Sequence, residues 1–330
     1  MVGISQLRNN TEVHKVAIII PFYNGASYLQ RLISSVFCNA GELDATIYIV
    51  DNSIASQRLP VDYTTDNRVV VLSAPTGIGY GRACNIGFER CKKDCPDFIA
   101  VVNQDGYFEA DALQVLVNRL LNEKNFTVAM PRLTRYESLA VEPFMIHVYL
   151  APMVQLISDL FNGATQAFYP ADALCGACFM INAKNFPFEV LFDPTFHMYY
   201  EDADLGRRLR LSNHRMMFVP QAVFHHSHTN SNDAMHTLTH LCGKQTSRHI
   251  YQLKNPEKQL WKAVASWSVI EFQSMVDQVL KLKARDLFVE LVSCFRLLTK
   301  LGAVAKSRKT EKMVRLQINH ASKECNNIWT

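Results

Sequence analysis

The stretch Phe98-Ile-Ala-Val-Val-Asn-Gln-Asp-Gly-Tyr107 decides the fold. Its first five residues are wholly apolar, which predicts a strand buried on both faces, as in a parallel sheet. The polar residues from Asn103 to Gly106 end this strand in a turn. Ligands of open α/β sheets bind beyond the carboxyl ends of the strands, so Asp105 is placed for binding. A carboxylate with Asn103 two residues before it suits a divalent cation on a diphosphate; the alternative is that Asp105 caps a helix at 110–121.

Three earlier apolar runs also have the length of buried strands: Val16–Ile20, Thr46–Val50 and Val69–Leu72. The first is followed by an amphipathic helix that opens at Ser27, and further strands are predicted at 128–131, 174–182 and 215–219. This alternation predicts an α/β fold with a mostly parallel sheet. Polar residues follow the early strands, namely Tyr23, Asp51 and Arg82. We expect them to line one crevice together with Asp105.

A glycine-rich loop, Gly77-x-Gly79-x-Gly81, follows the third of these strands. A dinucleotide-binding fingerprint would follow the first strand instead, where Gly25 is the one glycine of the turn. Here the glycines let the backbone approach a nucleotide or its phosphates, and Arg82 adds positive charge at the start of a helix. The alternative is a flexible loop before an ordinary helix start.

Composition limits the class of protein. A chain of 330 residues with 48% hydrophobic residues can bury the core of one large α/β domain, with or without an appendage. No apolar run reaches the roughly 18 residues that a spanning helix needs, and residues 1–15 lack an apolar signal core, so we expect a cytoplasmic protein. The nine cysteines are scattered, and the pair Cys175 and Cys178 has no partner pair for zinc, so we interpret them as reduced thiols.

Three carboxylates fall within four residues at Glu201, Asp202 and Asp204. Acidic residues at a helix start also complement the helix dipole, which is the structural alternative. These carboxylates, however, follow an aromatic cluster at 196–200. A carboxylate on a partly apolar shelf has its pKa raised towards that of a general base, so this cluster is a candidate catalytic site.

Two groups of basic side chains come next. His225, His226 and His228 place three imidazoles within four residues, which suits a cation site better than a lone histidine would. Residues 247–254 form a basic and aromatic patch in which Arg248 is predicted to face phosphates.

Charge is unevenly distributed along the chain. From Lys244 to the end there are 16 Lys and Arg against 7 Asp and Glu, a net charge of +9, whereas the remainder carries −5. We predict a catalytic domain at 1–255, with an aromatic-rich insertion at 134–170 that is either a lid or acceptor loop or a packed helical excursion. Residues 256–330 are predicted to form a basic amphipathic helical region. This region suits an anionic membrane surface; the alternatives are a bundle packed on the catalytic domain and a homodimer contact.

Six short motifs in order carry a family resemblance. They are Ile20-Pro-Phe-Tyr-Asn24, Val50-Asp-Asn-Ser53, Gly77-Ile-Gly-Tyr-Gly-Arg-Ala-Cys-Asn-Ile-Gly87, Asn103-Gln-Asp105, Tyr200-Glu-Asp-Ala-Asp-Leu205 and Phe224-His-His-Ser-His228. With these motifs the chain resembles the family 2 inverting glycosyltransferases of the GT-A fold, and among them the bacterial rhamnosyltransferase-like branch. The resemblance covers residues 16–254, and the C-terminal helices fall outside it.

The resemblance implies roles for individual residues. Asp105 matches the second acid of the family's DxD motif and would bind Mg²⁺ or Mn²⁺, with Asn103 in place of the first acid. His225 aligns best with a histidine that completes the metal site in some members, and His226 is its rival. Asp202 matches the catalytic base, beside Glu201. The donor-binding candidates are Pro21, Tyr23, Asn24, Asp51, Asn52, Gly79, Arg82, Asn85, Asn103, Gln104 and Arg248.

The implied activity is a single displacement. A sugar passes with inversion from a nucleotide-diphosphate donor to a growing cell-surface polysaccharide or lipid-linked acceptor, at the inner face of the cytoplasmic membrane. The branch favours dTDP-rhamnose as donor, and no nucleic-acid partner is expected. One alternative is a nucleotidyltransferase, which would need a Gly/Arg/Lys-rich loop where Tyr23-Asn24-Gly25 stands. The other is a non-catalytic nucleotide-sugar-binding subunit of a polysaccharide assembly complex.

Overall fold

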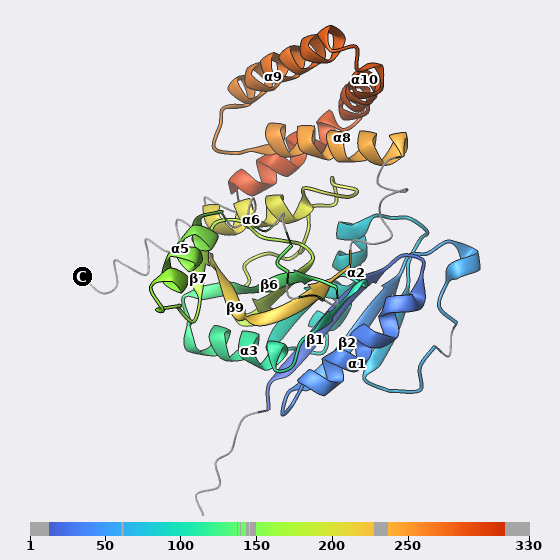
Figure 1. The fold of residues 1–330 in the computed structure, drawn as a ribbon. Helices are drawn as coiled ribbons and strands as arrows, with labels where there is room; N and C mark the ends of the chain where they lie inside the picture. Colours follow the sequence, from blue (N-terminus) through green and yellow to red (C-terminus); the bar gives the residue numbers. More distant parts are fainter. Residues whose placement is uncertain are drawn as a thin grey trace, which may run out of the picture.

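The computed structural model describes residues 13–60, 63–136, 138, 140–142, 145, 150–227 and 237–313. A central sheet is covered by helices on both faces, and a helical unit lies at one end of the molecule beyond α6 (Figure 1). His228 and part of the predicted 134–170 insertion lie outside the described residues. This arrangement confirms the predicted α/β fold with a C-terminal helical region.

The sheet has nine strands in two parts. One part is parallel, in the order β3-β2-β1-β4, and consists of β1 (Lys15–Phe22), β2 (Asp44–Asp51), β3 (Val69–Ser73) and β4 (Phe98–Val102). Next to β4 lies an antiparallel strand, β8 (Cys178–Asn182). The sheet then continues through β6 (Phe126–Arg135), β9 (Arg215–His226) and β5 (Gly106–Phe108), and β7 (Tyr169–Ala171) pairs with β9.

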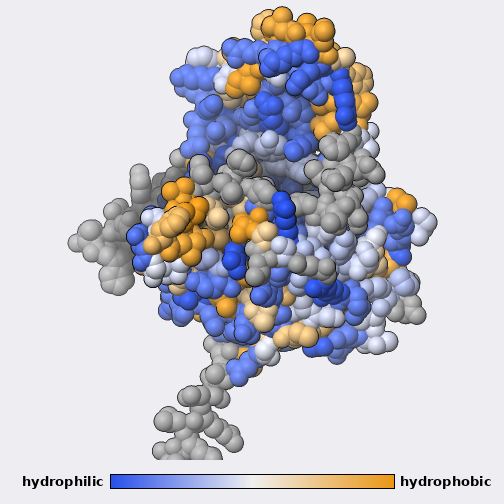
Figure 2. Space-filling view, viewed as in Figure 1, coloured by the Kyte–Doolittle hydropathy of each residue, from blue (hydrophilic) through white to orange (hydrophobic). Residues whose placement is uncertain are grey.

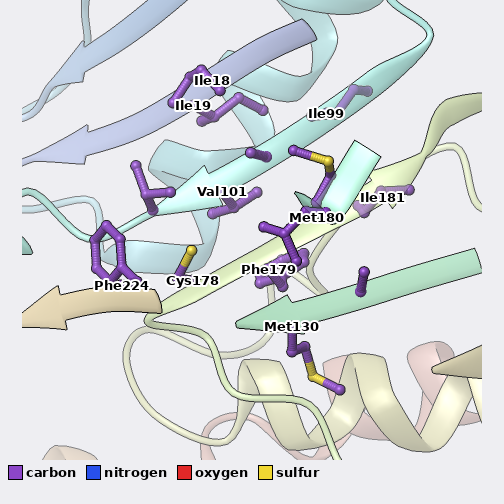
Figure 3. Close-up of a cluster of buried hydrophobic side chains, with 14 of the residues drawn as sticks. Ile18, Ile19, Ile99, Val101, Met130, Cys178, Phe179, Met180, Ile181 and Phe224 are labelled. Carbon is purple, nitrogen blue, oxygen red and sulfur yellow. The ribbon is translucent and has the colours of Figure 1, made fainter. Parts of the chain in front are cut away.

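Five α-helices in the described chain before residue 212 pack around the sheet and bury apolar side chains. They are α1 (Leu29–Asn39), α2 (Tyr80–Lys92), α3 (Ala112–Asn122), α5 (Leu150–Phe161) and α6 (Glu201–Leu211). Figure 3 shows part of the core, where Ile19 of β1, Val101 of β4 and Phe179 of β8 are fully buried. Each such side chain contributes about 1.5 to 3 kcal/mol relative to its exposed state. The continuous apolar character of β1 and β4 therefore follows from burial on both faces.

The C-terminal helices form a unit of their own. It comprises α8 (Leu238–Lys254), α9 (Leu260–Leu280), α10 (Ala284–Leu298) and a further helical stretch at 301–313. Ile250, Leu253, Leu297 and Val304 pack in a small cluster with Phe196 of the catalytic part. Within the described part of the chain, no helix combines the length and the apolar character needed to span a bilayer.

Two local differences from the predicted elements bear on the site. First, β5 follows Asp105, and α3 begins only at Ala112 after Asp111 in a left-handed conformation, so Asp105 does not cap a helix. Second, β9 does not end at Val219 but continues to His226. In its pairing with β6, Pro131 faces Val219 and the next residue, Arg132, faces Val223. The extra residues of β9 form a bulge that accommodates Pro220.

Candidate active site

Asp105, Asn103 and His226 meet at the carboxyl end of β4. The Nε2 atom of His226 lies 3.4 Å from Oδ1 of Asp105 and 3.0 Å from Nδ2 of Asn103. The backbone of β5 brings them together, because Gly106 pairs with His226 and the amide of Ser227 donates to the Asp105 carbonyl at 2.8 Å. The Asp105 side chain keeps 34% of its surface exposed, whereas His226 is buried. The structure therefore gathers one open carboxylate, one imidazole and one amide.

His225 contacts residues other than Asp105 and Asn103. Its ring stacks on Tyr107 with the centroids 4.4 Å apart, and its Nδ1 atom lies 2.9 Å from the Thr134 hydroxyl. Its Nε2 atom lies 3.3 Å from a carboxylate oxygen of Glu109. Neighbouring residues of a strand point to opposite faces, so β9 turns one imidazole towards Asp105 and the other away. Thr134 and Glu109 were not among the predicted site residues.

Gln104 holds the loop after β1 against the end of β4. Its side-chain oxygen accepts from the amide of Tyr23 at 2.7 Å, and its side-chain nitrogen donates to the carbonyl of Asn24 at 2.8 Å. The Asn24 amide donates to the Ser53 hydroxyl at 2.8 Å, and Asn52 donates to the carbonyl of Phe22 at 2.7 Å. Gln104, Asn24 and Asn52 thus fix the crevice wall, while the Tyr23 side chain is 47% exposed.

Asp51 is buried and fully engaged with the backbone. One carboxylate oxygen accepts from the amide of Ser53 at 2.9 Å and the other from the amide of Leu59 at 2.8 Å. Arg58, which the sequence interpretation missed, donates to the carbonyls of Asp51 and Ala74 at 3.3 and 2.6 Å. Asp51 therefore shapes the loop at the end of β2, where a nucleotide would lie. Pro21, also predicted at the donor site, is buried within β1 beside this loop.

Asp202 lies in the first turn of α6, facing the start of β8. Its Oδ2 accepts from the amide of Gly176 at 2.9 Å and its Oδ1 from the amide of Ala203 at 2.8 Å. A Cβ atom on Gly176 would lie 3.2 Å from Cβ of Asp202, so a side chain there would press on Asp202. Burial raises the pKa of Asp202, and the two backbone hydrogen bonds oppose that rise. The amides of Gly176 and Ala203 thus stabilise the negative charge of Asp202.

Glu201 is more strongly perturbed than its neighbour. Burial, followed by the charge of Asp202, raises the pKa of Glu201 to about 8. Its Oε2 atom is buried and accepts no hydrogen bond from the described residues. Tyr80, whose hydroxyl donates to the Gly176 carbonyl at 2.5 Å, closes the same corner. The pKa of both carboxylates is raised, and the additional effect of the Asp202 charge on Glu201 favours the proton on Glu201, so Asp202 is the candidate base.

One short path of backbone hydrogen bonds joins the Asp105 and Asp202 sites. The amide of Asn103 donates to the carbonyl of Ala177 at 2.9 Å, and the neighbouring Gly176 binds Asp202. Both carboxylates therefore lie at the same edge of the sheet, where β4 ends and β8 begins. This juxtaposition is the one that the sequence interpretation requires.

The glycine loop and α2 lie beside this edge. Gly79 has φ of +96°, and a Cβ atom there would lie 2.1 Å from the carbonyl oxygen of His197. Arg82 donates twice to the carbonyl of Pro194, at 3.1 and 2.9 Å. Asn85 exchanges hydrogen bonds of 2.7 and 2.8 Å with the backbone of Phe192. Gly79, Arg82 and Asn85 thus hold α2 against the 192–197 segment.

Arg248 belongs to the helical unit. It lies on α8 and forms an ion pair with Glu271 of α9 at 3.2 Å, with 30% of its side chain exposed. The aromatic ring of Tyr200, next to Glu201, lies 5.6 Å from that of Tyr251 on the same helix as Arg248, with the two ring planes tilted by 35°. The structure does not bring Arg248 to Asp105 by any contact among the described residues.

Comparison with known proteins decides the family. The model of Glycosyl transferase family 2 matches residues 17–187, which is more than half of the chain. The chain belongs to glycosyl transferase family 2. The enzyme is similar to the N-acetylglucosaminyl-diphospho-decaprenol L-rhamnosyltransferase of Mycobacterium tuberculosis, with 23% identity over 287 residues that cover 76% of the chain and 88% of the relative. It also matches the chondroitin synthase of Pasteurella multocida, with 27% identity over 129 residues, 35% of the chain and 12% of that protein.

Among solved structures, the glycosyltransferase resembles GalNAc-T7 crystallised with UDP, GalNAc and Mn²⁺. The TM-score is 0.53 at 14% identity, and the match covers 76% of the chain and 52% of GalNAc-T7. The chain thus spans about half the length of that protein. This likeness supports the GT-A fold, and together with the family it confirms the predicted fold class and enzyme class.

The residues around Asp105 in this glycosyltransferase fit a divalent cation. No described backbone amide donates to the Asp105 carboxylate, in contrast to Asp51, whose oxygens are both occupied. Carboxylate oxygen and imidazole nitrogen are ligands that Mn²⁺ accepts, and the oxygen also suits Mg²⁺.

Two other clusters with acidic side chains fit a divalent cation less well. Asp193, Asp204 and Glu311 surround the ammonium of Lys254, which already supplies a cation.

The second group combines His249, Glu290 and Cys294 in the helical unit. The indole nitrogen of Trp267 lies 3.0 Å from Nδ1 of His249, and a carboxylate oxygen of Glu290 lies 3.0 Å from Nε2, so both ring nitrogens already have partners. A metal at Nε2 would have to displace the contact with Glu290. The cluster is therefore better explained as a buried polar contact between α8, α9 and α10.

Proposed function

We propose that this glycosyltransferase moves a sugar, with inversion, from a nucleotide-diphosphate donor to a lipid-linked or polysaccharide acceptor. The observation that carries the proposal is the placement of Asp105 and Asp202 at one edge of the sheet, joined through Asn103, Ala177 and Gly176. Inverting transfer needs an open site for the leaving diphosphate and a base facing the acceptor. The sheet edge where β4 ends and β8 begins carries one carboxylate for each role.

The reaction is a single displacement at the anomeric carbon. Asp202 takes the proton of the acceptor hydroxyl while the acceptor oxygen bonds to that carbon, and the bond from the carbon to the diphosphate oxygen breaks on the opposite face. General-base assistance of this kind is worth about 10²- to 10⁴-fold in rate. Protonated Glu201 adds no second negative charge beside the base, and the amide of Gly176 keeps the carboxylate oriented.

Asp105 and His226, with Asn103 beside them, are the residues that would hold Mg²⁺ or Mn²⁺. A divalent cation there would supply the positive charge that stabilises a leaving diphosphate. His225 remains a weaker candidate because Thr134 and Glu109 engage both of its ring nitrogens. The donor-binding residues stay a proposal, with Tyr23 and the loops after β1 and β2 forming the wall of the nucleotide pocket.

The similarity to the mycobacterial relative supports the choice of substrates. That protein is an L-rhamnosyltransferase that acts on N-acetylglucosaminyl-diphospho-decaprenol. We therefore favour dTDP-rhamnose as donor and a lipid diphosphate-linked sugar as acceptor. To test this choice, the enzyme is incubated with dTDP-rhamnose and a lipid diphosphate-linked sugar, with and without Mn²⁺, and the product is measured by chromatography. Asp202→Asn should bind donor normally and transfer about 10²-fold or more slowly. Full activity of this variant would remove Asp202 from its role.

We also propose that residues 1–255 are the catalytic domain, although α8 at its end packs with α9 and α10 rather than with the sheet, and that the helices beyond it dock on an anionic membrane. On α9 and α10 several large apolar side chains are exposed, among them Trp261 at 66%, Phe272 at 68% and Phe295 at 69%. Figure 2 shows this apolar surface at the end of the molecule formed by α9 and α10. The net charge of +9 from residue 244 onwards complements anionic lipid.

Vesicle sedimentation tests the membrane contact. The turn between α9 and α10 exposes Leu280 at 77% and Leu282 at 91%, so Leu280→Glu with Leu282→Glu should release the protein from vesicles rich in phosphatidylglycerol. Phe161→Glu on α5, where the side chain is 88% exposed, is the matched control and should leave binding unchanged. Vesicle binding that neither salt nor the paired substitution weakens would contradict the proposal. A dimer that the pair dissociates would favour the homodimer alternative.

A further inference from the structure

Two cationic side chains, Arg82 and Lys300, meet where the helical unit reaches the segment packed against α2, and Arg296 lies nearby. Arg82 donates to the carbonyl of Pro194, and the ammonium of Lys300 donates to the carbonyl of the next residue, Thr195, at 3.1 Å. Arg296 lies one helical turn before Lys300 and raises the local positive potential at its ammonium. Two charged groups from distant parts of the chain are thus held by successive carbonyls of one loop.

No carboxylate balances this cluster. Among the described residues, none of Arg82, Arg296 and Lys300 has an acidic side chain within ion-pair distance, although basic residues nearby, such as Arg207 and Arg248, are paired. Burial, and then the charges of Arg82 and Arg296, lower the pKa of Lys300. Like charges brought together without a counter-ion destabilise the fold by their repulsion. An arrangement of this kind is typical of a site that binds an anion.

The position of the cluster indicates which anion. Arg82 stands in the first turn of α2, two residues after Tyr80, which contacts Gly176 beside the proposed base. The partial positive charge of a helix N-terminus adds to that of Arg82 there. Lys300 comes from the helical unit whose exposed apolar surface is proposed to meet the membrane. The cluster therefore lies where α2, whose first residue contacts Gly176 beside the proposed base, meets the helical unit.

We propose that Arg82, Arg296 and Lys300 bind the diphosphate of a lipid diphosphate-linked acceptor, in a site separate from the donor diphosphate at Asp105. The inference rests on the proposed function for the identity of the acceptor. Arg82 has a planar fork suited to phosphate oxygens, and Lys300 adds a mobile point charge. Binding the acceptor by its diphosphate would present its sugar hydroxyl to Asp202 without using the cation site.

The test uses the full-length protein and two readouts. Farnesyl diphosphate, a soluble lipid diphosphate, is titrated by calorimetry without divalent metal, and the KM values for donor and lipid-linked acceptor are measured separately. Lys300→Ala with Arg296→Ala should weaken farnesyl diphosphate binding and raise the acceptor KM by about tenfold or more, with the donor KM unchanged. Lys309→Ala, an exposed lysine of the same helical unit, is the matched control and should change neither value. Lys300→Arg should restore most of the binding.

The outcomes separate the two proposals. An increase of the donor KM alone would overturn the inference in favour of a donor diphosphate site, and unchanged binding in the double variant would overturn it outright. Farnesyl diphosphate binding that depends on Lys300, in a protein that transfers no sugar, would support the anion site and reject the proposed function. Transfer activity with an acceptor KM indifferent to Lys300 would reject the anion site and keep the proposed function.

Discussion

Replacement of Glu201 by glutamine tests the electrostatics of the proposed catalytic corner. Glu201 is 6% exposed, and burial and the charge of Asp202 raise its pKa from 4.5 to about 8. Between these two pH values the folded state holds a proton that the unfolded state has released. The free energy of unfolding of the native protein therefore falls as pH rises from 4.5 to 8 and levels off above 8. A glutamine at position 201 cannot ionise, so the variant does not show this fall in the free energy of unfolding.

The size of the effect follows from the shift. At about 1.4 kcal/mol per pH unit, the shift of Glu201 gives a ceiling of about 5 kcal/mol above pH 8. Relaxation and water penetration around a buried charge reduce it, so we expect Glu201→Gln to be more stable than the native protein by about 2 kcal/mol or more at pH 9. At pH 4.5 the two proteins should differ little, because the native side chain is then protonated in both states.

Urea unfolding at pH 5, 7 and 9, followed by circular dichroism, measures this difference. Glu89→Gln, at an exposed position of α2, is the control and should give the same difference from the native protein at each pH. A stability difference for Glu201→Gln that does not grow between pH 5 and 9 would refute the reasoning. It would mean that Glu201 is ionised at neutral pH, and the assignment of Asp202 as the single charged base would lose its support.

Other substitutions probe the remaining contacts. His226→Ala should raise the Mn²⁺ concentration for half-maximal activity by about tenfold or more, whereas His225→Ala should change it less; equal shifts in metal titrations would contradict the geometry. Gly79→Ala should lower the free energy of unfolding by about 2 kcal/mol or more in urea titrations, because φ of +96° and the carbonyl of His197 leave no room for a Cβ atom. Asp204→Asn should cost about 3 to 5 kcal/mol by leaving three buried cations without their shared carboxylate, and a cost below 1 kcal/mol would show that water replaces it.

Most of the parallel half of the sheet was predictable because β1, β2 and β4 are buried on both faces. Val16–Ile20 and Phe98–Val102 are apolar throughout, Thr46–Val50 is mostly apolar, and each lies inside a strand of the structure. The polar residue after each strand then falls at the shared edge by geometry alone. The helical periodicity after Pro256 was likewise sufficient to predict α9 and α10.

The choice between neighbouring histidines could not be made from the sequence. It depends on which face of β9 each imidazole takes, and a shift of one residue in register exchanges the faces. The bulge between Val219 and Val223 sets that register through pairing with β6, a strand about 90 residues earlier. Adjacent residues with the same side chain carry no signal for such a long-range pairing. The resemblance favoured His225 over His226, whereas the structure places His226 beside Asp105.

The start of β8 explains why the two halves of the proposed mechanism depend on one another. This strand is antiparallel to β4, and its lead-in residues Gly176 and Ala177 hold Asp202 on one side and Asn103 on the other. Gly176 has no side chain to press on Asp202, whose Cβ and Oδ2 atoms would lie 3.2 and 3.3 Å from a Cβ atom there. A rigid backbone segment thus sets the spacing between the diphosphate end and the base end of the crevice. Because Asp105 stands in the short turn between β4 and β5 and Asp202 in the first turn of α6, we expect both carboxylates of the proposed mechanism to be positioned before the substrates bind.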